Sequence, residues 1–216
     1  MRIPRLLVPA AVAIVIAFGT RSSMAQYATV ENMAFIGGGG GNPAGTVTQY
    51  TTSSAWQAAG TANLGTETFA GRNGFYPSPV TGSVGSAPAV DWTATAPGGI
   101  FFGNLGGMPL LSTNQPEPLT ITFSGEPVSG VGGAIFDTDM GFGVQSNTWT
   151  QVKVSVVGGS SQTFSRYDLS ISDFWGFHST GAAIQSIEIT AGVPVPAPGT
   201  LALLGACGFV RSRRRR

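Results

Sequence analysis

Apolar and polar residues alternate with a period of two in the second half of the chain. The segment 119–123 alternates apolar residues with threonine, and the segment 152–156 alternates valine with lysine and serine. Side chains on a strand point alternately to opposite faces, so each pattern predicts a β-strand with one buried and one solvated face. Ile187 and Ile189 indicate a similar strand near the end of the chain.

Further short segments lie between turn signals and predict more strands. Gly158 and Gly159 form a turn signal after the valine strand, so we expect a hairpin that continues into 161–169. Eight to ten short strands at this spacing predict an all-β fold, an antiparallel β-sandwich of the jelly-roll type. The remaining expected strands are 27–36, 46–52, 89–95, 100–105, 130–137 and 174–178.

Helix is expected only at 54–59, with Ser53 or Ser54 as the N-cap and Gly60 as the stop. The segments 37–41 and 76–88 are rich in glycine or proline and are predicted to be loops. No internal repeat of the length typical of a propeller or solenoid occurs. We therefore expect residues 26–192 to form a single domain.

The N-terminus has the pattern of a secretory signal peptide over residues 1–25. Two arginines precede an apolar run at 6–18, and small residues end the segment at Ser23 and Ala25. Cleavage after Ala25 would leave Gln26 as the mature N-terminus. An uncleaved signal anchor is the alternative, although Pro9 interrupts a run that is already short.

The last residues, 193–216, have an order that suits a sorting signal better than a folded domain. Three prolines precede 199–210, an uncharged run that spans about 18 Å as a helix, against a hydrocarbon core of roughly 30 Å. A basic cluster follows and would stay on the cytoplasmic side of the membrane. This cluster consists of Arg211, Arg213, Arg214, Arg215 and Arg216.

The proline motif Pro196-Ala197-Pro198, the apolar run and the arginine cluster resemble the PEP-CTERM sorting signal, a tail also described as an ice-binding protein C-terminal domain. The resemblance implies transient inner-membrane association and recognition by an exosortase, a membrane cysteine protease. It also implies delivery to the cell surface or extracellular matrix, with signal peptidase acting at the other end. Ala197 replaces the central glutamate of the family motif, and a retained C-terminal tail anchor is the alternative interpretation.

The resemblance extends loosely into the domain. The segments 174–179 and 184–189 are similar to the last two strands of many exported PEP-CTERM β-sandwich proteins. This similarity implies an aromatic-rich strand paired with an alternating one, and it confers no activity.

Removal of both ends changes the charge of the protein. Three basic residues remain against ten acidic ones, a net charge of −7, whereas the whole chain sums to +1. A domain without a basic patch is not expected to bind nucleic acid or an anionic membrane surface. Cys207 is the only cysteine and lies in the tail, so the domain must be stabilised by its core and without a disulfide.

The sequence contains no pattern typical of a catalytic site. His178 is the only histidine, which excludes a site with several histidine ligands, and no Gly-x-Ser-x-Gly motif is present. The glycine run at 37–41 lacks the Lys-Ser/Thr sequence of a phosphate-binding loop. Ten acidic residues could include a glycosidase pair, but nothing selects one, and we do not expect an enzyme.

Two groups of residues are candidates for binding. Asp137 and Asp139 lie two positions apart and could offer hard oxygen ligands to a structural calcium ion, the only cofactor considered. Exposed indole rings could stack on sugars, although burial in the core is the ordinary fate of tryptophan in a sandwich. The candidates for stacking are Trp56, Trp92, Trp149 and Trp175.

Two functions of different classes remain open. The first is a structural or adhesive component of the surface polymer layer, which acts by display. The second is a carbohydrate-binding module that recognises extracellular polysaccharide, with or without calcium. An exported hydrolase is a third alternative and would require a carboxylate essential for turnover.

Overall fold

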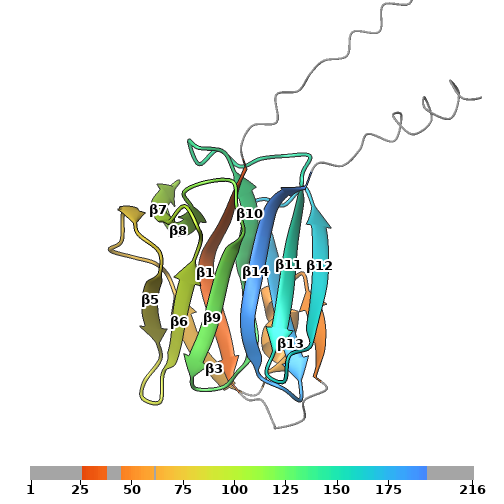
Figure 1. Cartoon of the computed structure of the whole chain (residues 1–216). Coiled ribbons are helices and arrows are strands. Elements are labelled where there is room, and N and C mark those ends of the chain that lie inside the picture. The colour runs from red at the N-terminus through yellow and green to blue at the C-terminus, as the bar shows by residue number, and fades with distance from the viewer. Residues whose placement is uncertain (1–25, 38–44, 61, 194–216) are drawn as a thin grey trace, which may run out of the picture.

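The computed structural model of the chain describes residues 26–37, 45–60 and 62–193, which contain fourteen strands and one helix. The strands form two antiparallel sheets that pack face to face (Figure 1). The prediction of an all-β antiparallel sandwich is therefore confirmed. The predicted processing residue Ala25, the motif Pro196-Ala197-Pro198 and the arginine cluster lie outside the described residues.

The first sheet has six strands in the order β12-β11-β14-β9-β6-β5, and these lie side by side across the front of Figure 1. The hairpin predicted at Gly158 and Gly159 is present, since β11 pairs with β12. The strands are β5 (Val80–Val84), β6 (Val90–Thr95), β9 (Leu119–Gly125), β11 (Trp149–Val156), β12 (Ser161–Tyr167) and β14 (Ile184–Val193).

The second sheet has eight strands and lies behind the first. Seven of them follow the order β2-β13-β10-β1-β8-β7-β4, and β3 pairs with part of β1. The strands are β1 (Tyr27–Gly37), β2 (Thr46–Tyr50), β3 (Ala62–Glu67), β4 (Gly74–Tyr76), β7 (Ile100–Leu105), β8 (Met108–Thr113), β10 (Val128–Thr138) and β13 (Phe174–Thr180).

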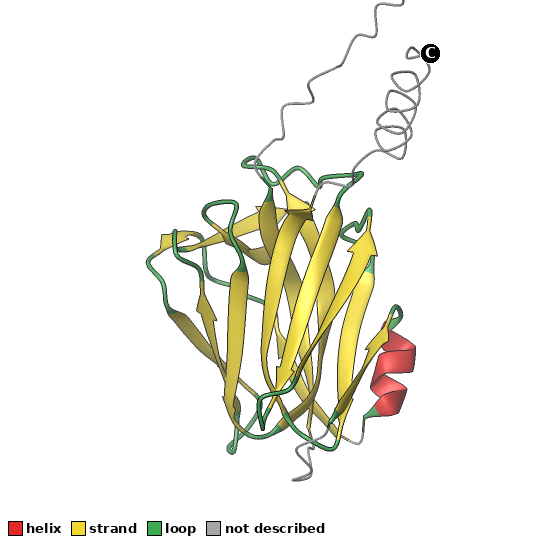
Figure 2. Ribbon diagram, turned by 45° about the vertical axis from the view of Figure 1, so that its right-hand side comes forward, coloured by secondary structure: helices red, strands yellow, loops and turns green. Residues whose placement is uncertain are grey.

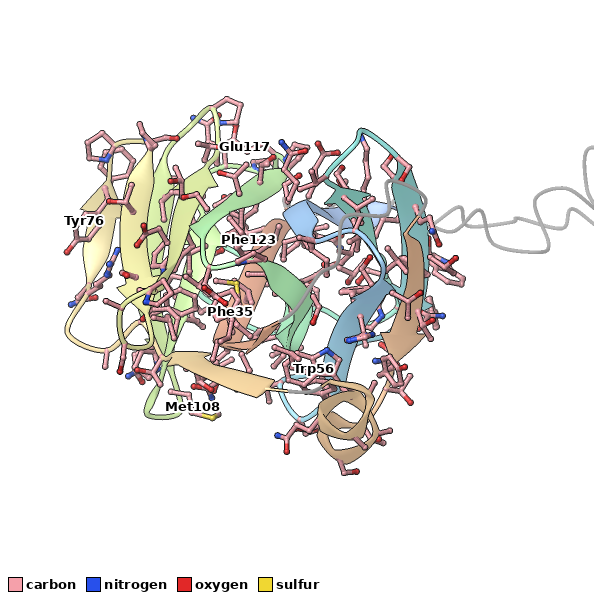
Figure 3. The ribbon with its side chains drawn as sticks, turned by 90° about the horizontal axis from the view of Figure 1, so that it is seen from below. Phe35, Trp56, Tyr76, Met108, Glu117 and Phe123 are labelled. Carbon is pink, nitrogen blue, oxygen red and sulfur yellow. The ribbon has the colours of Figure 1, made fainter. Side chains whose placement is uncertain are left out.

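The core lies between the two sheets and is made by the inward positions of the alternating strands. Phe35 of β1 meets Phe123 of β9 edge to face, with 5.6 Å between ring centroids (Figure 3). Towards one side of the sandwich, Trp92 packs against Phe69, and the guanidinium of Arg72 lies 4.9 Å from the Trp92 ring centroid. Burial of these apolar faces supplies the main stabilisation of a domain whose single-cysteine chain offers no internal disulfide.

Helix α1 (Ser53–Ala59) lies beside the eight-stranded sheet (Figure 2), and its Trp56 is buried against strands β10 and β13. Gly176 makes this approach possible, because a Cβ there would lie 2.7 Å from Trp56 Cδ1. The indole Nε1 donates a hydrogen bond to the carbonyl oxygen of Phe177 at 3.0 Å. The predicted N-cap was wrong by one or two positions, since the side chain of Thr52 caps the helix.

The structure corrects three further expectations. Segment 76–88 is not a continuous loop, because it contains β5, whose glycine accommodates the ring of Trp92. Strands β13 and β14 are not partners, since β13 pairs with β10 and β2 while β14 pairs with β11 and β9. The sequence patterns also missed β3, β4 and β8. No helix within the described ranges has the length and apolar character needed to cross a membrane.

Candidate functional site

Three of the four tryptophans proposed for sugar stacking are core residues. Trp56, Trp92 and Trp175 are at most 1% exposed. Each also donates its Nε1 proton to an internal acceptor, which for Trp92 is a carboxylate oxygen of Glu67 and for Trp175 the side-chain oxygen of Gln49. These three rings therefore cannot serve as surface platforms, and the hypothesis is wrong for them.

Trp149 is the remaining candidate and lies on the outer side of the six-stranded sheet. It is partly exposed and directly opposite Tyr167 on β12, which is 46% exposed. The two ring centroids lie 5.5 Å apart. The hydroxyl of Tyr167 donates to Asn147 Oδ1 at 3.1 Å, which orients this ring. Together they form an aromatic pair at one end of strands β11 and β12.

The same outer side carries a row of hydroxyl side chains that crosses every strand of the sheet. Direct cross-strand pairing joins these residues from one edge of the sheet to the other. At about 4.8 Å between strands the row is about 24 Å long. We call it the hydroxyl row, and in order it consists of Thr81, Thr93, Thr122, Ser186, Ser155 and Ser161, all of them partly or fully exposed.

The hydroxyl row itself is uncharged, and charged residues lie in the rows on both sides of it. On one side the exposed Asp91 lies two positions from Thr93 on β6 and pairs with Ser83 and Ser124. In the row on the other side Lys153 lies directly opposite Glu188, so their opposite charges are adjacent. Thr120 and Thr163 continue that row on either side of the pair.

The pair of Trp149 and Tyr167 lies on the same outer side, six positions from Ser155 along β11. The face is therefore rich in hydroxyl groups and has aromatic rings at the far end of β11 and β12.

Asp137 and Asp139 do not share a set of partners. Asp137 is buried, and its carboxylate accepts hydrogen bonds from the hydroxyls of Thr148 and Thr150 and from the amide of Gly192. Burial raises the pKa of Asp137, and these three hydrogen bonds oppose that shift. Asp137 thereby ties β10 of one sheet to β11 and β14 of the other.

Asp139 instead organises the turn that follows β10. Its Oδ1 accepts the amide protons of Gly141 and Gly143, both at 2.8 Å, and its Oδ2 accepts from Gln145 at 3.2 Å. No group of three histidine, cysteine or acidic side chains suited to a metal occurs among the described residues. The geometry therefore assigns both aspartates to hydrogen bonding within the protein, and calcium binding stays a prediction.

A buried carboxylate that the sequence did not single out lies at an irregular point of β1. Glu31 is 2% exposed, and the strand register shifts immediately after it, where Asn32 has φ +47°. Asn32 Nδ2 donates to Glu31 Oε1 at 2.6 Å, and burial raises the pKa of Glu31. Glu31 lines an open groove of about 400 Å³ together with Asp173. Sequence alternation could not find this site, because the bulge that creates it leaves no sequence signature.

His178 lies on β13 and is partly buried, and burial lowers its pKa. Among the described residues, no carboxylate or nucleophilic side chain forms a hydrogen bond with the His178 ring, so the surroundings of this histidine do not resemble a catalytic triad.

Comparison with protein-family models, with curated proteins and with solved structures found no match for the chain.

Proposed function

We propose that this protein is an exported component of the cell surface or extracellular matrix, sorted by an exosortase, and that its β-sandwich adheres to neutral polysaccharide. The observation that carries the adhesive part is the face formed by the hydroxyl row and the aromatic pair of Trp149 and Tyr167. This proposal combines a structural role at the cell surface with carbohydrate binding. A domain that adheres to a polymer needs an extended binding surface and no catalytic activity.

The chemistry of this face favours a neutral, hydroxylated polymer. Serine and threonine hydroxyls both donate and accept hydrogen bonds, as sugar hydroxyls do. Aromatic rings pack on the apolar C–H faces of sugar rings. The negative net charge expected for the domain would repel polyanions, and the face itself has only one basic residue, Lys153, opposite Glu188.

The export part is supported by where the sandwich begins and ends. β1 begins at Tyr27, directly after the predicted cleavage position, and β14 ends at Val193, directly before the first proline of the tail. Gln26 and Gly192 lie in contact, since a Cβ on Gly192 would clash with the Gln26 side chain. Among the described residues, the strands begin one residue after Gln26, and of the segment 193–216 only Val193 takes part, paired with Trp149.

Affinity electrophoresis of the full chain tests the adhesive face. We expect neutral dextran or soluble cellulose derivatives in the gel to retard the protein, and polyanionic alginate to have no effect. Trp149→Ala should weaken retardation by about tenfold, a loss of about 1.4 kcal/mol in binding. Replacing two adjacent hydroxyls, Thr122→Val with Ser186→Ala, should weaken it by about threefold.

A matched control makes the same two chemical changes elsewhere on the molecule. Thr48→Val with Ser54→Ala alters exposed residues of β2, an edge strand of the eight-stranded sheet, and of α1, and it should bind as the parent does. Adhesion through this face would be overturned if both double variants lost retardation equally, or if no neutral polymer retarded the parent protein.

A further inference from the structure

Five strands of the described chain have a hydrogen-bonded strand on one side only. These edge strands are β2, β3 and β4 in the eight-stranded sheet, and β5 and β12 in the six-stranded sheet. The outer amide and carbonyl groups of an edge strand can pair with another chain, so native sheets protect them with short strands, prolines, charges or covering groups. The five edges of this molecule are not protected equally.

Four of the edges are short or covered. When the two ends of the Gln162 carboxamide are assigned by their contacts, its nitrogen donates to the Val47 carbonyl of β2 at 3.2 Å and its oxygen accepts from the Val47 amide at 3.1 Å. On β5 the guanidinium of Arg72 donates to the Thr81 carbonyl at 2.9 Å, and Pro79 directly precedes the strand. Strand β4 has only three residues, and β3 contacts β5 of the other sheet.

Strand β12 has none of these protections. It is the longest of the five edge strands, and all seven of its residues, Ser161–Tyr167, pair with β11 without a bulge. It contains no proline, glycine or lysine. Outside its ladder with β11, no hydrogen bond from another described residue reaches its backbone. It is the outermost strand on the right of Figure 1, so its free edge faces outwards.

The one charged residue of β12 does not guard this edge. The guanidinium of Arg166 is directed into the sandwich, where it donates to the Phe174 carbonyl at 2.9 Å and lies 5.8 Å from the Trp175 ring centroid. The exposed side chains of the strand are all uncharged. They belong to Ser161, Thr163, Ser165 and Tyr167.

This strand is complementary to itself under a two-fold axis. With Phe164 on the axis of an antiparallel pair, Thr163 lies opposite Ser165 of the second copy, and Arg166 lies opposite Gln162 of the second copy. Like charges therefore do not meet anywhere along the pair. The same register keeps outward side chains on one face and inward side chains on the other.

We propose that β12 pairs with β12 of a second copy of this chain, antiparallel, so that the two six-stranded sheets join into one twelve-stranded sheet. The interface goes beyond adhesion to polysaccharide and does not require it, because the pairing uses the backbone of one strand. In such a dimer the outer faces of both copies are continuous, and one polymer can be held at two places.

Sedimentation of the full chain over a wide range of concentrations tests the proposal, and we expect a monomer–dimer equilibrium. Thr163→Glu with Ser165→Glu should raise the dimer dissociation constant by about tenfold, because two pairs of carboxylates would face each other across the axis. Lys153 lies opposite Thr163 within the same chain, so the new charge at position 163 has a partner in the monomer.

Thr163→Glu with Ser165→Lys is the matched rescue. It places opposite charges face to face in the antiparallel pair, so this variant should dimerise at least as tightly as the parent. Thr93→Glu with Thr95→Glu adds the same charge as the double glutamate variant on β6, four strands from β12. That distance is about 19 Å, beyond the Debye length of about 10 Å at 0.1 M salt, so the dimer should be unchanged.

Every variant carries the same two termini, so association through the termini would affect all of them alike. The proposal is overturned if the parent stays monomeric at all concentrations, or if the two β12 variants dimerise equally. It is also overturned if the β6 variant weakens the dimer as much as the double glutamate variant of β12 does.

Discussion

Glu31 shows how an irregularity in a strand can bury an ionisable side chain at the edge of a groove. Its carboxyl is 2% exposed, has the side chain of Asn32 as a partner, and has a pKa raised by burial. Because folding raises this pKa, the folded protein binds the proton more tightly than the unfolded chain does. The resulting stabilisation is complete below the ordinary glutamate pKa and is lost as the pH rises through the raised value.

Glu31→Gln should therefore raise the free energy of unfolding at about pH 7, and have little effect at about pH 4. The reason is that glutamine has no buried charge to desolvate and can still accept the hydrogen bond from Asn32. Denaturant unfolding at both pH values measures the difference.

Asp173 provides a control of opposite sign in the same groove. Hydrogen bonds from the side chain and amide of Ser170 lower the pKa of Asp173, so its stabilisation is present above the ordinary aspartate pKa and is lost as the pH falls through the lowered value. Asp173→Asn should thus reduce stability at about pH 7. If the Glu31→Gln variant is less stable than the parent at about pH 7, the ionised carboxylate of Glu31 stabilises the fold and the prediction is wrong.

At the scale of elements, glycine determines how closely helix α1 approaches the sheet. Gly130 and Gly176 lie on adjacent strands beneath Trp56, and their missing side chains leave room for the indole. The glycine-rich composition, 32 of 216 residues, therefore has a packing role on the strands as well as a role in turns. A bulky residue at either position would separate the helix from the sheet.

Gly176→Ala should lower the free energy of unfolding by about 2 kcal/mol, the range expected for overpacking. Its Cβ would meet Trp56 Cδ1 at 2.7 Å and the Phe174 ring at similar distance. Gly141→Ala is the matched control, because a Cβ there makes only ordinary contact, at 3.4 Å. Thermal unfolding of both variants measures the two changes in stability. An equal loss of stability in both would refute the role of Gly176 in packing helix α1 against the sheet.

The elements that the sequence predicted well are those with a regular pattern. Strands β9 and β11 alternate strictly because one face meets the core and the other meets solvent. Strands β3, β4, β5 and β8 are short or contain glycine or proline, which leaves no clear alternating pattern in the sequence. Local patterns also could not show that β13 and β14 enter different sheets.

The candidate sites were predicted less well, for a similar reason. Tryptophan content alone cannot distinguish a platform from a core residue, and only Trp149 of the four is outside the core. The hydroxyl row depends on the register of six strands, so no single segment contains it.

For the whole molecule, the two sheets present different chemistry outwards. The six-stranded sheet presents a face rich in hydroxyl groups, while the outer side of the eight-stranded sheet carries the helix and the groove of Glu31. Such a division suits a displayed domain that contacts a polymer along one side. The proposal as a whole requires that the domain reach the outside of the cell and lose both ends.

Mass spectrometry of the protein recovered from its own cell envelope and medium tests this requirement directly. We expect a species that begins at Gln26 and ends near Pro196, produced by signal peptidase and exosortase. An intact C-terminus at Arg216 in the envelope would indicate a retained tail anchor. Recovery of the whole chain from Met1 to Arg216 in the cytoplasmic fraction, with no processed form outside, would show that the protein is neither exported nor sorted.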